Sequence, residues 1–278
     1  MGDCVKVKKK FLSDLEWRWI YQVSFNNTFD LKANCFEGSM EDGIPYKQRV
    51  AIDLGYDFPS SYPNLLAWDA ESFAEGLSPD PYQDKIRCLA TWPSFFVKGR
   101  REAITAFLKH VKKKNPDLIV DFFGRFYDIP LLLAECRRLG IRCRLGRDGS
   151  EPYILRREFE RRGRGKREHT IRINGRVHFD VHKEVDADYA LTRAGIKHRG
   201  LNNVAQFFGL NPITDVNHAA IPEDRLEETN LDDARCTFEI AQIYLRVLYE
   251  LAEYLKVPLN MIVERSPSHI PNFIYGRE

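Results

Sequence analysis

The sequence predicts an α/β layered fold, because short apolar strands alternate along it with segments of helical periodicity. Its 278 residues suffice for one large domain with a small addition. A hydrophobic content of 44% supports a substantial core and argues against disorder throughout. We expect no membrane association, because the apolar runs are much shorter than a membrane span and no signal peptide is recognised.

The first half of the chain is expected to supply most of the sheet. Residues 1 to about 43 read as strand-like and amphipathic, and buried strands are predicted at 65–71 and 86–92. Apolar residues with helical spacing predict a helix over 103–113, which Asn-Pro-Asp ends. A further buried strand is expected over 118–123.

The second half mixes a basic hairpin with helices. A helix over 130–139 is closed by a glycine, and strands at 153–157 and 170–173 flank an arginine-rich tip. An Asn-Gly turn leads into a strand over 177–181. A long helix is expected over 231–255. Six cysteines without C-x-x-C spacing indicate reduced thiols, mostly in the core, and a cytoplasmic protein.

Four carboxylates lie in three short motifs, and they are the candidate catalytic and metal-binding residues. Asp69 and Glu71 form a D-x-E pair on one strand face, Asp128 follows the next apolar strand, and Asp233 begins the long helix. Four hard oxygen ligands suit Mg²⁺ or Mn²⁺, and two such ions can promote phosphodiester hydrolysis. Structural alternatives are a turn cap for Asp69, a helix N-cap for Asp128 and a dipole contact for Asp233.

These motifs resemble a known family. LLAWDAES, NPDLIVDFFGRFYDIPLLLAECRRLGI, GRVHFD and NLDDARCTFEIA are similar, in this order, to segments of the exonuclease domain of archaeal-type family B DNA polymerases, which are DnaQ-like (DEDD) nucleases. The resemblance implies an RNase H-like fold with a mixed central sheet flanked by helices. It also implies a truncated β-rich N-terminal remnant over 1–63, the exonuclease domain over 64–256, and a tail over 257–278 that resembles the lead-in to a polymerase palm.

The resemblance implies metal-dependent 3′→5′ hydrolysis of single-stranded or frayed DNA ends, with Asp69, Glu71, Asp128 and Asp233 holding two Mg²⁺ or Mn²⁺ ions. Asp180 in GRVHFD is expected to support these ligands through hydrogen bonds rather than to ligate. The chain departs from the family twice. Thr229 replaces the tyrosine that orients the attacking water, and Phe123 replaces an asparagine that helps to hold the DNA end. We therefore expect a slow or differently assisted nuclease.

DNA contacts are expected from a basic segment. Residues 137–172 contain 13 Lys/Arg and 5 Asp/Glu, so their balance is +8 and that of the remaining chain is about −6. This charge would attract phosphates without reading sequence, although a solvated arginine-rich hairpin is the structural alternative. The predicted DNA-binding residues are Phe123, Arg161, Arg162, Arg164 and Lys166.

Two other functional classes remain open at this point. One is a catalytically weak scaffold that binds DNA or a partner, and the other is the exonuclease half of a split polymerase. Possible partners are a polymerase or another replication protein, in replication or repair at the nucleoid. The segment 57–63 resembles the first polymerase motif but precedes the exonuclease motifs, and no other polymerase motif follows, so polymerase activity is not expected from this chain.

Overall fold

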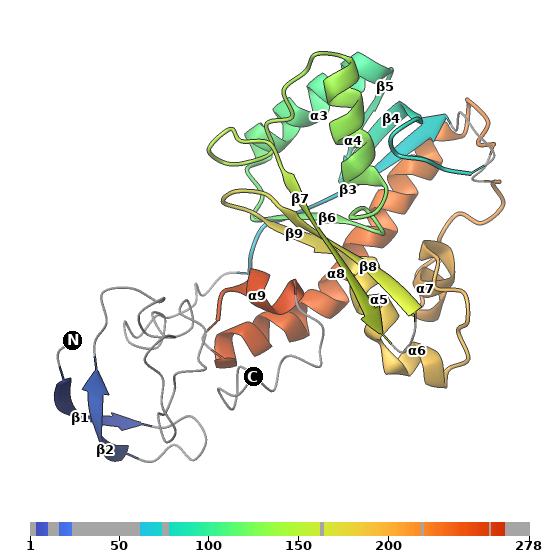
Figure 1. The fold of residues 1–278 in the computed structure, drawn as a ribbon. Helices are drawn as coiled ribbons and strands as arrows, with labels where there is room; N and C mark the ends of the chain where they lie inside the picture. Colours follow the sequence, from blue (N-terminus) through green and yellow to red (C-terminus); the bar gives the residue numbers. More distant parts are fainter. Residues whose placement is uncertain are drawn as a thin grey trace. The chain divides into compact units, whose positions relative to one another are not determined.

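The structure, a computed structural model, describes residues 4–10, 17–23, 62–73, 78–161, 164–217, 220–255 and 257–264 (Figure 1). The chain divides into two compact units. Residues 61–247 form one unit, and residues 1–60 together with 248–278 form the other. The larger unit contains the central sheet and every candidate site residue whose side chain is described. The predicted boundaries at 63/64 and 256/257 stay a prediction.

A five-stranded mixed sheet is the framework of the larger unit, and its strand order is β5-β4-β3-β6-β9. The central strand β3 (Leu65–Phe73) pairs antiparallel with β4 (Lys85–Trp92) and parallel with β6 (Leu118–Asp121). At the edges, β5 (Phe95–Lys98) is antiparallel to β4, and β9 (Val177–Asp180) is parallel to β6. This arrangement confirms the predicted mixed sheet.

Two helices cover one face of the sheet, α3 (Arg100–Lys114) and α4 (Asp128–Arg138). Alternate residues of β3 point toward them, so Trp68 is buried and stacks on Phe107 of α3 with ring centroids 4.8 Å apart. These residues belong to the main apolar cluster, which also contains Ile86, Leu89, Ile119, Leu131 and Leu132. Burial of this face fixes the register of β3, because a shift by one residue would exchange its two faces.

The long helix α8 (Leu226–Leu255) contacts the opposite face. At its start, Leu226 packs with Cys88 of β4 in a separate small cluster. A β-bulge in the pairing of β3 with β4, between Glu71 and Ser72, explains this placement. The extra residue lets Ile86 face α3 and α4 while Cys88, only two positions later, faces α8.

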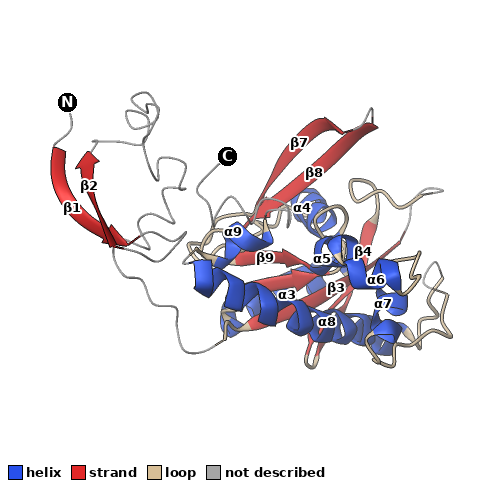
Figure 2. Ribbon diagram, turned by 90° about the horizontal axis from the view of Figure 1, so that it is seen from below, coloured by secondary structure: helices blue, strands red, loops and turns tan. Residues whose placement is uncertain are grey.

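The hairpin of β7 (Tyr153–Arg161) and β8 (Arg164–Arg172) is antiparallel and lies outside the five-stranded sheet. Figure 2 shows it projecting beyond the central sheet and its helices. Both strands are longer than the 153–157 and 170–173 expected from sequence. A strand that extends into a charged segment is stable here because every residue from Tyr153 to Arg161 has a partner on β8.

Several element boundaries differ from those expected. The strand predicted over 118–123 ends at Asp121, because its pairing with β9 ends there and Phe123 adopts a left-handed backbone with φ +71°. The helix predicted over 231–255 begins five residues earlier. The sequence reading missed strand β5, and it also missed the short helices α5 (Val181–Ala187), α6 (Tyr189–Arg193), α7 (Leu201–Phe207) and α9 (Leu259–Val263).

In the N-terminal part, β1 (Cys4–Lys10) pairs antiparallel with β2 (Trp17–Val23), as the strand-like pattern predicts.

Four of the cysteines, Cys88, Cys136, Cys143 and Cys236, are free and buried, which agrees with the expected core location. Among the helices of the described residues, none combines the length and the apolar character that a membrane span requires. Most of the segment 57–63 lies outside the described residues, and so does most of the tail after residue 256.

Candidate metal centre

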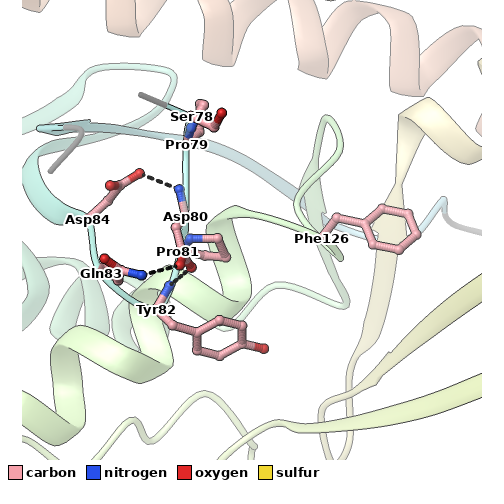
Figure 3. A pocket seen from close by; sticks show the side chains of 8 residues that line it. All are labelled: Ser78, Pro79, Asp80, Pro81, Tyr82, Gln83, Asp84 and Phe126. Carbon is pink, nitrogen blue, oxygen red and sulfur yellow. Dashed lines mark hydrogen bonds between the residues drawn. The ribbon is translucent and has the colours of Figure 1, made fainter. Parts of the chain in front are cut away.

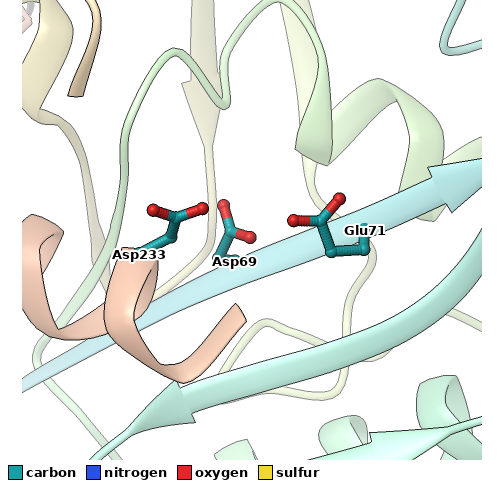
Figure 4. Close-up of side chains that lie close together, drawn as sticks. All are labelled: Asp69, Glu71 and Asp233. Carbon is teal, nitrogen blue, oxygen red and sulfur yellow. The ribbon is translucent and has the colours of Figure 1, made fainter. Parts of the chain in front are cut away.

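Three of the four predicted carboxylates meet between β3 and the start of α8. Asp69 and Glu71 lie on the face of β3 opposite Trp68, and Asp233 projects toward them from α8 (Figure 4). One oxygen atom from each of the three residues lies within 4.8 Å of those from the other two. The two-residue period of a strand and the position of α8 therefore bring residues more than 160 positions apart to one point.

Burial and repulsion between carboxylates raise the pKa of each of these three carboxyl groups. Burial, partly offset by a hydrogen bond from Asn230, raises the pKa of Asp69 to about 6. Burial and the charge of Asp69 raise the pKa of Glu71 to about 8, although Arg87 acts in the opposite direction. Burial and the charges of Asp69 and Glu71 raise the pKa of Asp233 to about 9. A divalent cation would relieve the repulsion that causes part of these shifts.

The donor set fits a hard divalent cation. Carboxylate oxygens are the preferred protein ligands of Mg²⁺ and Mn²⁺. Opposite ligands of an octahedral Mg²⁺ lie about 4.2 Å apart, twice the metal–oxygen distance. The observed spread of up to 4.8 Å exceeds this separation by about 0.6 Å, so the three oxygens would have to move slightly closer together to share one ion.

The fourth predicted ligand, Asp128, lies outside this three-residue group. It is the first residue of α4 and is 6% exposed. Burial raises its pKa well above the usual value, and the charges of Asp69, Asp121 and Asp180 add to the effect. Asp128 is thus close enough to Asp69 for their charges to interact, but it is not among the three residues whose oxygens lie within 4.8 Å of one another.

Asn230 is a supporting residue that the sequence reading missed. Its Nδ2 donates to Asp69 Oδ2 at 2.5 Å, and its Oδ1 accepts from the Cys88 thiol at 3.5 Å. The side chain of Asn230 is fully buried. Because it lies three residues before Asp233 on α8, one turn of helix supplies both a carboxylate and the amide that orients another.

Asp121 is a further buried acid that sequence reasoning overlooked. Its Oδ2 lies 2.7 Å from His178 Nε2, and both side chains are almost inaccessible to water. Burial would lower the pKa of His178, but the Asp121 charge raises it on balance. A Cβ atom at Gly124 would lie 2.1 Å from Asp121 Cγ, so only glycine leaves room for this carboxylate. The pair connects β6 to β9 beneath the loop that leads to Asp128.

Asp180 holds that loop from the other side, and it is also the N-cap of α5. Its Oδ1 accepts from the backbone N–H groups of Phe123 at 2.9 Å and His182 at 3.0 Å. Its Oδ2 lies 3.2 Å from Arg125 Nε. These contacts are directed at the backbone and at Arg125. A direct hydrogen bond to a predicted metal ligand, which the sequence reading expected, is not among them.

Thr229, a predicted catalytic residue, is fully buried, and its Oγ1 has no hydrogen-bond partner. It lies one helical turn before Asp233 on α8, and therefore on the same side of the helix. The neighbouring acids have other roles. Asp232 Oδ2 accepts from the backbone of Ile213 at 2.7 Å, and Glu228 pairs with Arg225 at 2.9 Å.

The predicted DNA-binding residues divide into two groups. Phe123 is 43% exposed in the loop after β6. Arg161 and Arg164 are at the ends of β7 and β8, and Lys166 is on β8. The side chains of these three, and the whole of Arg162, lie outside the described residues. At the base of the hairpin, Arg156 hydrogen-bonds to the Tyr82 hydroxyl and packs over its ring, 5.6 Å from the centroid.

A pocket of about 500 Å³ lies beside this contact, lined by residues 78–84 and Phe126 (Figure 3). Its wall is held by Asp84, which accepts from the Asp80 backbone N–H at 2.9 Å and from the Tyr127 hydroxyl at 2.6 Å. The Tyr127 hydroxyl also lies 2.6 Å from Ser72 Oγ. Ser72 and Tyr127 are sequence neighbours of Glu71 and Asp128.

Comparison with known proteins agrees with this geometry. Residues 65–204, half of the chain, match the family described as DNA polymerase family B, exonuclease domain. The chain is 27% identical over 285 residues to a DNA polymerase of Thermococcus litoralis, covering 91% of this chain and 16% of that protein. It is also 27% identical over 287 residues to a DNA polymerase of Pyrococcus glycovorans, covering 92% and 36%. The chain thus spans only a minor part of either relative.

A solved structure shows the same fold. The family B DNA polymerase from the hyperthermophilic archaeon Pyrobaculum calidifontis superposes with a TM-score of 0.67 over 98% of this chain and 41% of that chain. The sequence identity is 22%. The likeness confirms the RNase H-like arrangement of a mixed sheet with flanking helices.

Proposed function

Since this chain belongs to the exonuclease domains of the family B DNA polymerases, we propose that it is a metal-dependent 3′→5′ exonuclease that acts on single-stranded or frayed DNA ends. The observation that carries the proposal is the convergence of Asp69, Glu71 and Asp233 within 4.8 Å. The product would be nucleoside monophosphates, released from the 3′ end.

Each residue has a proposed role in this reaction. Asp69, Glu71, Asp128 and Asp233 would together hold two Mg²⁺ or Mn²⁺ ions. When bound, the metal ions supply a hydroxide nucleophile and charge stabilisation at the leaving oxygen. Asn230 fixes the orientation of Asp69 through its 2.5 Å hydrogen bond. Asp180 holds the Phe123 backbone at 2.9 Å and thereby shapes the loop that precedes Asp128.

Thr229 is proposed to orient the attacking water. Its buried hydroxyl lacks a protein partner and lies one turn from Asp233, which supports this role. A threonine reaches less far than the tyrosine of the family. Loss of a well-placed acid–base contact costs about 10²- to 10⁴-fold in rate, so we expect slow turnover.

The basic hairpin is proposed to bind the DNA backbone through Arg161, Arg162, Arg164 and Lys166. Its projection beyond the sheet supports contact with a long strand (Figure 2). We propose further that residues 1–63 and 257–278 form parts separate from the exonuclease domain. The chain would work together with a polymerase or another replication protein. Its proposed role is in DNA replication or repair, in the cytoplasm.

The rival function is a DNA-binding scaffold whose site has decayed. It is favoured by the absence of the family tyrosine and asparagine at Thr229 and Phe123. The experiment that separates the two uses a 5′-labelled single strand with Mn²⁺ and compares wild type with Asp69→Asn and Asp233→Asn. Wild type should give a ladder of shortened strands, and both variants should give none.

A matched control is Asp224→Asn, which changes an exposed acid on a different segment and should leave the ladder unchanged. Equal degradation by wild type and both site variants would show that another site, or a contaminating nuclease, is responsible. An inert wild type that still binds the strand would instead establish the scaffold.

A further inference from the structure

The β-bulge beside the carboxylates places an arginine where a regular strand pairing would not. Glu71 and Ser72 of β3 pair with the residues on either side of Arg87, so Arg87 is the extra residue of the bulge and has no partner on β3. Bulges are frequent next to active sites, where they redirect a side chain. The Arg87 guanidinium carbon lies 5.3 Å from the ring centroid of Phe73. Because Phe73 and Glu71 are two positions apart on β3, Arg87 lies on the face of the sheet that carries the carboxylates.

The Arg87 guanidinium binds the segment that leads into α8. Its Nη1 donates to the backbone carbonyl of Ile221 at 2.9 Å, and its Nη2 forms an ion pair with Glu223. Lys98 of β5 contacts the same carboxylate at 3.0 Å. The Glu223 side chain is 65% exposed, whereas Ile221 is buried. An exposed ion pair contributes little by itself, so the shielded bond to the Ile221 carbonyl is the more important contact.

This segment continues directly into the helical turn that carries the site residues. The Arg225 N–H donates to the Pro222 carbonyl at 3.1 Å, and the Arg225 carbonyl accepts from the Thr229 N–H at 3.0 Å. Backbone hydrogen bonds therefore connect the segment that Arg87 binds to the first turn of α8. A displacement of this segment would also displace Asp233, which follows on the same helix.

The charge of Arg87 also reaches the metal centre. Burial and the charge of Asp69 raise the pKa of Glu71, and Arg87 acts in the opposite direction. A fixed positive charge repels a divalent cation, even where that cation replaces one proton, because two charges enter for one that leaves. The charge of Arg87 by itself would therefore weaken metal binding, whereas correct placement of Asp233 would strengthen it. The two effects have opposite signs and can be separated by experiment.

We infer that Arg87 is a positioning residue of the candidate metal centre, which holds the start of α8 on β4 and thereby places Asp233 beside the carboxylates of β3. The inference rests on the proposed function, because it presupposes that these carboxylates bind Mg²⁺ or Mn²⁺. In this role Arg87 contacts neither the metal nor the DNA. It acts through the backbone of residues 221–225.

The test measures Mn²⁺ binding rather than hydrolysis. The full chain is titrated with Mn²⁺, and electron paramagnetic resonance reports the unbound ion. Arg87→Met removes the guanidinium but keeps a long side chain. It should weaken Mn²⁺ binding by about 10- to 100-fold, the range for residues that orient metal ligands. Arg87→Lys keeps the charge but lacks the two-armed guanidinium, so it should also bind Mn²⁺ more weakly than wild type.

Arg147→Met is the matched control. Arg147 likewise binds a backbone carbonyl, that of Pro116 at 3.3 Å, and a carboxylate, that of Asp117 at 2.5 Å. None of these residues belongs to the candidate metal centre. The control should lower the thermal midpoint in EDTA but keep the wild-type affinity for Mn²⁺.

Three outcomes would overturn the positioning role and leave the proposed nuclease intact. They are unchanged or tighter Mn²⁺ binding by Arg87→Met, wild-type affinity in Arg87→Lys, and an equal loss of affinity in Arg87→Met and Arg147→Met. Tighter binding would mean that Arg87 acts only through its charge. If Arg87→Met does not fold, Arg87→Lys decides the question. A wild type that binds no Mn²⁺ would overturn the proposed function together with the role of Arg87.

Discussion

The replacement Asp233→Asn tests whether the three converging carboxylates store repulsion that a cation relieves. In the metal-free folded protein, Asp233 keeps its proton up to about pH 9, whereas the ordinary value for an unfolded chain is 3.8. Between these values the folded state holds one more proton than the unfolded state. The free energy of unfolding must therefore fall as the pH rises, by about 1.4 kcal/mol per pH unit for this group.

From pH 5 to pH 8 this slope amounts to a loss of about 4 kcal/mol from Asp233 alone. The value is an upper limit, because Asp69 and Glu71 share the same repulsion and its relief by one proton is not additive. In EDTA at pH 8, Asp233→Asn should be more stable than wild type, and the difference should shrink toward pH 4. Saturating Mn²⁺ should act in the opposite direction. It stabilises wild type by about 2.7 kcal/mol at one hundred times its dissociation constant, and the variant by less.

The assay is urea unfolding at pH 5, 6, 7 and 8, with EDTA or with Mn²⁺, for wild type, Asp233→Asn and the exposed control Asp224→Asn. The control should follow wild type in every condition. A wild-type stability in EDTA that stays constant or rises from pH 5 to pH 8 would refute the reasoning. A Mn²⁺ effect of equal size in wild type and Asp233→Asn would refute the assignment of Asp233 as a ligand.

Three further replacements probe the surroundings of the carboxylates. Asn230→Ala removes the amide that orients Asp69. This variant should need about 10- to 100-fold more Mn²⁺ for the half-maximal exonuclease rate. An unchanged Mn²⁺ titration would contradict this role of Asn230. Thr229→Val keeps the shape of the side chain but removes its unpartnered hydroxyl. If the hydroxyl holds the attacking water, the exonuclease rate should fall by about 10²-fold. If the threonine is purely structural, the variant should be more stable than wild type and have an unchanged exonuclease rate. The triple replacement of Arg161, Arg162 and Arg164 by Ala should lower the slope of log affinity against log salt by about 0.7 for each phosphate that the hairpin no longer neutralises, and an equal slope in wild type and variant would leave the hairpin without a role in binding.

The central carboxylates could be placed from sequence because simple periodicity governs them. Asp69 and Glu71 share a face by the two-residue period of a strand, and the apolar pattern around them fixes which face is buried. Asp233 lies near the start of a long amphipathic helix, but only the family resemblance distinguishes it from its neighbour Asp232 as a ligand. The order of strands and helices in the larger unit was equally accessible, apart from β5 and the short helices.

The supporting residues could not be placed, because each depends on contacts between distant segments. From the sequence alone, Asn230 resembles a surface residue near the start of a helix. Only the packing of α8 against β3 brings it to Asp69. Asp121 reads as the polar end of a strand, and only the pairing of β6 with β9 brings it to His178. A signal did exist at Gly124. A glycine three residues after a buried acid is compatible with a close approach of that acid to the backbone, but glycine is just as common in loops where it only lets the chain turn.

Because the two faces of β3 have different roles, insertions and deletions in this strand are poorly tolerated. Trp68 fills the core on one side, while Asp69 and Glu71 contribute to the candidate metal centre on the other. A single codon inserted between Leu65 and Trp68 would rotate every following side chain to the wrong side. Carboxylates would then replace Trp68 against Phe107, and the tryptophan would project toward α8. Gain or loss of one codon in this strand would therefore disrupt the apolar core and the candidate metal centre in one event.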